Sequence, residues 1–75
     1  MKIENFKVLA VDGDGTVQLL NLDMVSRGVQ HAAVWCFTDD KLKQGQRVRG
    51  GFDFDPADSL IGGFPTFTRV QDESA

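Results

Sequence analysis

Apolar and polar residues alternate with a period of two over most of this chain, a pattern that predicts strands rather than helices. Residues 3–11 alternate in this way, and residues 16–23 are rich in Val and Leu. Residues 29–37 are apolar at both parities, which is typical of a bent central strand that serves two sides of a barrel. Three strands are therefore expected in the first half of the chain.

The second half of the chain predicts two further strands. Residues 46–55 carry apolar side chains on one face and charged ones on the other. Residues 62–70 form a fifth apolar stretch, in which Pro65 favours an edge position or a bulge. In residues 38–45, Thr38 can cap a helix, acids follow it, and lysines precede a glycine. This charge order predicts one or two helical turns between the third and fourth strands.

Five short strands with glycine kinks and one short helical turn predict an all-β fold. We expect a small five-stranded antiparallel β-barrel, OB-like or SH3-like, with the helical turn between strands three and four. Because 75 residues leave room for only one core, the single domain is expected to cover residues 1–70, with residues 71–75 as a frayed tail. The residues expected in this core are Val8, Leu20, Val34, Val48 and Phe52.

One segment, KLKQGQRVRGGF at residues 41–52, resembles the loop and fourth strand of cold-shock OB domains. In that family a Gly-Gln pair precedes an apolar strand. The aromatic Lys-Gly-Phe-Gly-Phe motif that carries nucleic-acid binding there is missing from the first half of this chain. The resemblance therefore transfers no binding residue.

The stretch DGDGT at residues 12–16 resembles the nucleophile motif of the haloacid dehalogenase phosphatases. The resemblance implies that Asp12 attacks phosphorus, that Asp14 is the general acid and base, and that Thr16 closes the loop. Such an enzyme also needs a parallel sheet flanked by helices, which this sequence does not predict. Glycines between two strand-like runs instead predict a hairpin turn, with the aspartates capping its amides. A dehalogenase-type phosphatase is kept as a remote alternative.

No other pattern of residues in the sequence predicts a catalytic or metal-binding site. His31 has no Cys or second His at ligand spacing, and the serines have no His at the spacing of a hydrolytic triad. We therefore expect no catalytic residue, no metal site and no cofactor, and hence a protein that is not an enzyme. The single cysteine, Cys36, lies in an apolar segment and is expected to be a buried, unreactive thiol.

Net charge and the length of the apolar runs bear on solubility, DNA binding and membrane association. The net charge of −3 predicts a small, acidic, soluble molecule and opposes a main role in binding duplex DNA. The longest apolar runs are only a few residues, and the first residues lack the features of a signal peptide. We expect no membrane association and a cytoplasmic location.

The distribution of charge predicts a binding surface. Half of the basic residues fall within residues 41–49, ahead of the acidic stretch DFDPAD. They are either the solvated outer face of the fourth strand or a site that binds with a nearby aromatic ring. The candidate binding residues are Lys41, Lys43, Arg47, Arg49, Phe52 and Trp35.

Two classes of partner suit these candidates. Another protein is the favoured partner, because the acidic total opposes phosphate binding and the chain has no Tyr for base stacking. Single-stranded nucleic acid, bound as on OB surfaces, is the alternative. A homodimer formed through an open edge strand, near Pro65 or at the first strand, is a further alternative.

Overall fold

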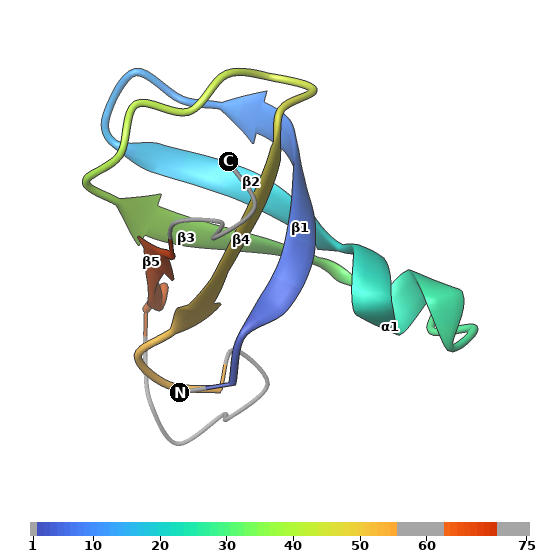
Figure 1. Ribbon diagram of the computed structural model, residues 1–75. Helices are drawn as coiled ribbons and strands as arrows, with labels where there is room; N and C mark the ends of the chain where they lie inside the picture. Colours follow the sequence, from blue (N-terminus) through green and yellow to red (C-terminus); the bar gives the residue numbers. More distant parts are fainter. Residues whose placement is uncertain (1, 56–62, 71–75) are drawn as a thin grey trace.

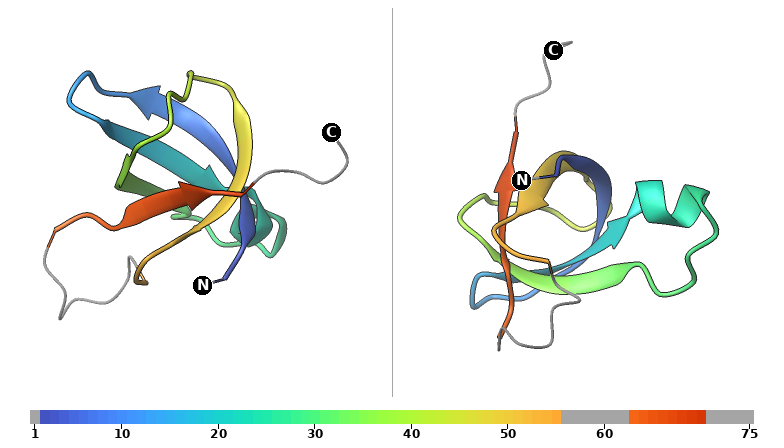
Figure 2. Two further views of the ribbon diagram at one scale, coloured as in Figure 1. Left: turned by 60° about the vertical axis from the view of Figure 1, so that its left-hand side comes forward. Right: turned by 90° about the horizontal axis from the view of Figure 1, so that it is seen from below.

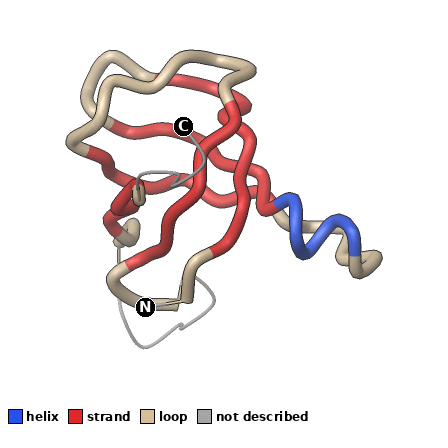
Figure 3. Tube along the Cα trace, viewed as in Figure 1, coloured by secondary structure: helices blue, strands red, loops and turns tan. Residues whose placement is uncertain are grey.

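The computed structural model describes residues 2–55 and 63–70 of the chain, and the expected tail at 71–75 lies outside them. The described part contains a single short helix, and its strands form a compact ring (Figures 1 and 3). No helix among these residues has the length and apolarity that a membrane crossing requires. The elements are β1 (Glu4–Val11), β2 (Thr16–Asn21), α1 (Leu22–Ser26), β3 (Ala33–Thr38), β4 (Arg47–Phe52) and β5 (Thr66–Arg69).

The five strands close into a barrel in the order β1-β2-β3-β5-β4. β1 pairs antiparallel with both β2 and β4, so it closes the ring. β5 lies between β3 and β4, and this order is that of an OB fold rather than of an SH3-like meander. The prediction of an all-β, five-stranded barrel is confirmed.

The expectation of a purely antiparallel barrel is wrong at one pair of strands. β3 and β5 run parallel, through the pairs Phe37–Thr66 and Thr38–Phe67. The reason is geometric, because strand direction cannot alternate all the way around a closed ring with an odd number of strands. At least one neighbouring pair must be parallel, and in this barrel it is the β3–β5 pair.

The helical turn expected between the third and fourth strands is also wrong. Thr38 Oγ1 accepts a hydrogen bond from the Asp40 N–H at 3.2 Å, as a cap would, but no helix follows. Instead the connection places Leu42 in the core, where it is buried. Burying this side chain while the chain passes from β3 to β4 favours an irregular path over a helical one.

The helix forms earlier, directly after β2, because both of its ends are capped. Asn21 Oδ1 accepts a hydrogen bond from the Met24 N–H at 3.0 Å. At the other end Gly28 has a φ of 86°, and its N–H donates to the Val25 carbonyl at 3.0 Å. None of the helical residues is buried, and α1 projects from the side of the barrel (Figure 2). The two caps therefore set the ends of this helix.

Inward-facing side chains of the strands and one loop residue form a single core. Of the expected core residues, Val8 and Val48 are buried in it, and Val34 and Phe52 are half-buried against it. The expectation for Leu20 is wrong, because its neighbour takes the inward position. The buried core residues are Phe6, Val8, Val17, Leu19, Cys36, Leu42, Val48 and Phe67.

Three phenylalanines pack edge to face at the centre of this core. The ring centroids of Phe6 lie 5.3 Å from Phe52 and 5.4 Å from Phe67, and those of Phe52 and Phe67 are 5.7 Å apart. Gly50 makes this packing possible, since a Cβ there would overlap the Thr68 carbonyl and come within 2.6 Å of the Phe67 ring. The glycine in β4 therefore lets β5 approach closely.

Candidate functional site

A basic face covers the outside of β4 and its pairing with β1. Arg47 and Arg49 flank the buried Val48, so both project outward from β4 and are exposed. Across the β1–β4 pairing, Lys7 lies opposite Arg47 and Asn5 lies opposite Arg49. Lys7 thus extends the predicted basic strip onto a second strand.

A third arginine joins this face from β5. Arg69 lines the same hollow as Arg47 and Arg49, a space of about 280 Å³ whose lining residues also include Asn5 and Val70. The sequence separates Arg69 from β4 by many residues, and only the β4–β5 pairing brings it near. The three arginines and Lys7 are called the basic face below.

The loop lysines precede β4, and Lys43 lies near its start. Lys41 and Lys43 are both exposed, on either side of the buried Leu42. The Lys43 N–H donates to Gln46 Oε1 at 3.0 Å, which holds this part of the loop beside the start of β4. The structure therefore brings Lys43 near the predicted arginines.

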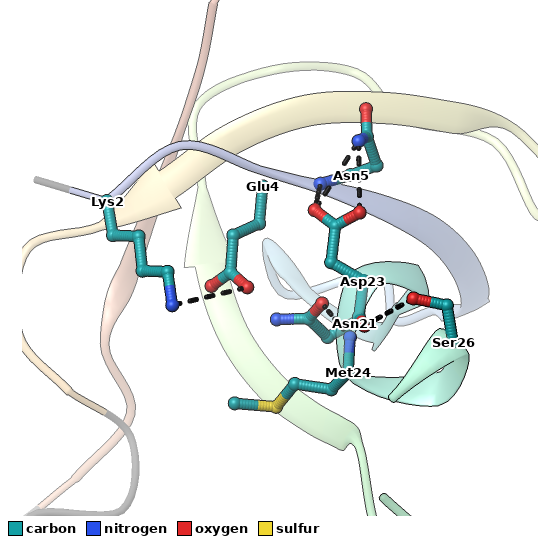
Figure 4. A network of polar contacts seen from close by, with 7 residues as sticks. All are labelled: Lys2, Glu4, Asn5, Asn21, Asp23, Met24 and Ser26. Carbon is teal, nitrogen blue, oxygen red and sulfur yellow. Dashed lines mark hydrogen bonds and ion pairs between the residues drawn. The ribbon is translucent and has the colours of Figure 1, made fainter. Parts of the chain in front are cut away.

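One carboxylate of α1 moderates the charge of the basic face. The backbone N–H of Asn5 donates to Asp23 Oδ2 at 2.9 Å, and the Asn5 side-chain amide reaches the same carboxylate (Figure 4). These hydrogen bonds, assisted by the charges of Arg27 and Arg49, lower the pKa of Asp23 below its usual value of 3.8. Asp23 therefore stays ionised and offsets part of the Arg49 charge.

The two predicted aromatic residues are not part of the basic face. The Phe52 ring packs in the core against Phe6 and Phe67. Trp35 projects outward from β3 and is 37% exposed. Since β5 separates β3 from β4 on one side of the ring, and β1 and β2 separate them on the other, Trp35 and Arg47 point to different sides of the barrel.

Trp35 belongs instead to an aromatic face with Phe37 and Phe64, which are 45% and 49% exposed. The ring centroids of Phe37 and Phe64 are 5.8 Å apart. The sequence held a signal for this face, because residues 29–37 are apolar at both parities. The two parities face different ways: Cys36 faces the core, whereas Trp35 and Phe37 face outward.

Carboxylates border the aromatic face at the end of β3. Phe37 is paired with Thr16, and the Thr38 N–H donates to the Gly15 carbonyl at 3.2 Å, so the β1–β2 turn lies against this end of β3. The turn and the residues after β3 supply exposed acids on both sides of that contact. These acids are Asp12, Asp14, Asp39 and Asp40.

The DGDGT stretch forms the predicted hairpin turn between β1 and β2. The Asp12 N–H donates to the Thr16 carbonyl at 2.9 Å, and Asp12 Oδ1 accepts from the Gly13 N–H at 2.8 Å. Asp14 Oδ1 accepts from the Thr16 hydroxyl at 2.6 Å and from its N–H at 3.1 Å. Both carboxylates therefore serve the turn, on a barrel rather than on a parallel sheet flanked by helices.

Other groups in the described ranges do not suggest a metal site. Residues 2–55 and 63–70 contain no group of three or more His, Cys, Asp or Glu placed to hold a metal ion. Burial raises the pKa of Cys36 to about 12, so its thiol stays protonated at neutral pH. His31 is exposed near the start of β3.

Comparison with known proteins assigns this barrel to no family. No protein-family model matches the chain, and no curated protein or solved structure is significantly similar to it. The basic face and the aromatic face, on different strands of the ring, are therefore the basis for a functional interpretation.

Proposed function

We propose that this protein is a non-enzymatic binding module whose partner is another protein, and that the aromatic face of Trp35, Phe37 and Phe64 is its docking surface. Exposed aromatic side chains on a strand are presented rigidly, and aromatic residues dominate the energy of protein interfaces. The observation that carries the proposal is the group of exposed carboxylates at the Phe37 end of this face, in the β1–β2 turn and directly after β3. It suits a partner whose interface presents Lys or Arg side chains.

Single-stranded nucleic acid is the second candidate, because OB barrels bind it on the side of strands two and three, where aromatic rings stack on bases. Such binding also needs basic residues that follow the phosphates beside the stacked bases. In this barrel acids border the aromatic rings, and Arg47 and Arg49 lie on another side. The separation favours the protein partner.

The basic face has a place in the same proposal as a second contact surface. Arg47, Arg49 and Arg69 are suited to an acidic segment, since guanidinium groups bind carboxylates through paired hydrogen bonds. Lys41 and Lys43 would extend this contact at one end. A partner of mixed charge could thus contact both faces in one orientation only.

The test compares two double variants of the immobilised protein in nuclease-treated lysate. Trp35→Ser with Phe37→Ser changes the aromatic face, and Arg47→Gln with Arg49→Gln changes the basic face. We expect a protein that the wild type captures to bind the aromatic variant at least about tenfold more weakly once purified and titrated. Equal affinity of that variant, shown to be folded by circular dichroism, would remove the aromatic face from the proposal.

A second titration separates the two classes of partner. Trp35 is the single tryptophan, so its fluorescence reports directly on the aromatic face. With a short mixed-sequence single strand at low salt, we expect no saturable change in emission. Saturable quenching that weakens as salt is added would establish the nucleic-acid candidate instead.

A further inference from the structure

A cleft of about 640 Å³ opens between the start of β1, helix α1, the start of β3 and the end of β4. Its size is within the range of pockets that hold small organic groups. Most of its lining is apolar, with Phe6, Met24, Val34 and Phe52 among the side chains. It shares only Phe6 with the described lining of the hollow among the arginines, and it includes neither Trp35 nor Phe37. The proposal below is therefore independent of the proposed function.

One wall of the cleft holds a carboxylate with an unmet hydrogen-bond requirement. The Glu4 side chain is only 12% exposed, and its Oε2 is buried without a hydrogen-bond partner. Among residues 2–55 and 63–70, Lys2 forms an ion pair with it, and its Nζ lies 3.9 Å from Oε2, beyond hydrogen-bond distance (Figure 4). A buried carboxylate oxygen is costly unless a donor reaches it, so this position favours a group that brings N–H donors.

The charges around the cleft select a cation. Glu4 and Asp53 line it, and its described lining residues also include Lys2 and His31. Asp53 Oδ1 already accepts a hydrogen bond from the Thr66 N–H of β5. Asp53 therefore contributes negative charge to the cleft rather than a free acceptor at this oxygen. Lys2 is 69% exposed and can swing away at little cost. Its ammonium marks a position that another ammonium group can occupy.

We propose that this cleft binds an alkylammonium group, with the ammonium on Glu4 Oε2 in place of Lys2 and the alkyl chain against Met24, Val34 and Phe52. An ammonium is a compact charge with three donors, and it can satisfy one buried oxygen from inside the cleft. The same chemistry occurs in free aliphatic amines and in the lysine side chains of proteins. The ion pair between Lys2 and Glu4 is an example of this ammonium–carboxylate contact. A better-placed amine would lie closer to Glu4 Oε2 than the Lys2 Nζ does.

The test is a titration with n-butylamine, which is protonated at neutral pH because alkylamines have a pKa of about 10.4. The readout is the set of NMR signals of the Met24, Ala32 and Val34 methyl groups, and n-butanol is the uncharged control. We expect saturable shifts with the amine only. Equal shifts with the alcohol, or no saturable shift with either, would overturn the proposal.

Two variants change the binding in opposite directions. Glu4→Gln should weaken the amine at least about tenfold, since it removes the charge and keeps the shape. Lys2→Gln should tighten it severalfold, because the internal competitor is gone, and this variant leaves the barrel unchanged. If Glu4→Gln fails to fold, Lys2→Gln decides, and unchanged or weaker binding there would contradict the proposal. Comparing butylamine with Nα-acetyl-lysine methylamide shows whether a free amine or a lysine side chain fits better.

Discussion

At the level of single residues, Asp14 illustrates how one carboxylate contributes to a turn. Its hydrogen bonds from the Thr16 side chain and backbone lower its pKa below the usual 3.8. A lowered pKa in the folded state means that the contribution is present above pH 3.8 and is lost as the pH falls towards the folded value. The turn should therefore weaken in acid.

We expect Asp14→Asn to flatten the dependence of the free energy of unfolding on pH in this acidic window. Urea unfolding of wild type and variant, followed from about pH 5 to pH 2, measures the difference. The two curves should run parallel above this window, where the wild-type carboxylate is ionised in both states. Curves that remain parallel down to the lowest pH would show that the turn does not depend on this charge.

Single residues also mark a limit of the sequence pattern. Cys36 was predictable as a buried thiol, because an apolar run surrounds it. The sequence could not show which of the adjacent residues Leu19 and Leu20 faces the core, since both are equally apolar. Leu19 pairs with the buried Val8, and the register of β1 against β2 shifts just beyond that pair. A shift of one residue exchanges the inward and outward faces, and a pairing register is not a local property.

At the level of elements, none of the residues of α1 is buried, so its caps and the hydrogen bonds from Asn5 to Asp23 stabilise it. We expect Asn21→Ala to lower the free energy of unfolding by about 1 kcal/mol, because the Met24 N–H loses its acceptor. Asn21→Ser, which can still cap, is the matched control and should recover most of this loss. Urea unfolding and hydrogen exchange at the Met24 amide measure both effects. Equal exchange in the Ala and Ser variants would mean that packing of residue 21, rather than capping, holds the helix.

The strands could be predicted from the sequence, whereas their arrangement and the helix could not. Local apolar patterns identify each strand, but the parallel β3–β5 pair follows from closure of the ring. The helical signals after Thr38 were real, yet the burial of Leu42 outweighed them. The capping residues of the observed helix, Asn21 before it and Gly28 after it, were present in the sequence. The apolar run that leads into them instead suggested a continuing strand.

At the level of the whole molecule, like charges on the basic face oppose one another. Lys7 lies directly across from Arg47, and the ion pair found in residues 2–55 and 63–70 joins Lys2 to Glu4 instead. We expect Arg47→Gln with Arg49→Gln to keep the free energy of unfolding within about 1 kcal/mol of the wild type. Added salt should stabilise the wild type more than this variant, because it screens repulsion that the variant lacks.

Unfolding at low and high salt measures this difference, with Lys41→Gln and Lys43→Gln in the loop as the charge-matched control. A larger loss in the arginine variant would show that the guanidinium groups hold the barrel together. The sequence predicted the positive charge of the basic face, but it did not predict which residues from other strands lie beside it. Arg69 joins the basic face through the β4–β5 pairing, and Phe64 joins the aromatic face through its contact with Phe37. The strand order likewise separates Trp35 from the arginines.

The position of β5 between β3 and β4 also bears on how quickly the barrel forms. The ring closes only when Glu4 meets Gly50 and when Phe37 meets Thr66, so residues far apart in the chain must find each other. The entropy of closing those loops is lost before the paired strands stabilise the structure. Topologies of this kind fold in roughly milliseconds to seconds, far more slowly than helical bundles of similar length. The strand order that separates the basic face from the aromatic face is thus also the feature that sets the pace of folding.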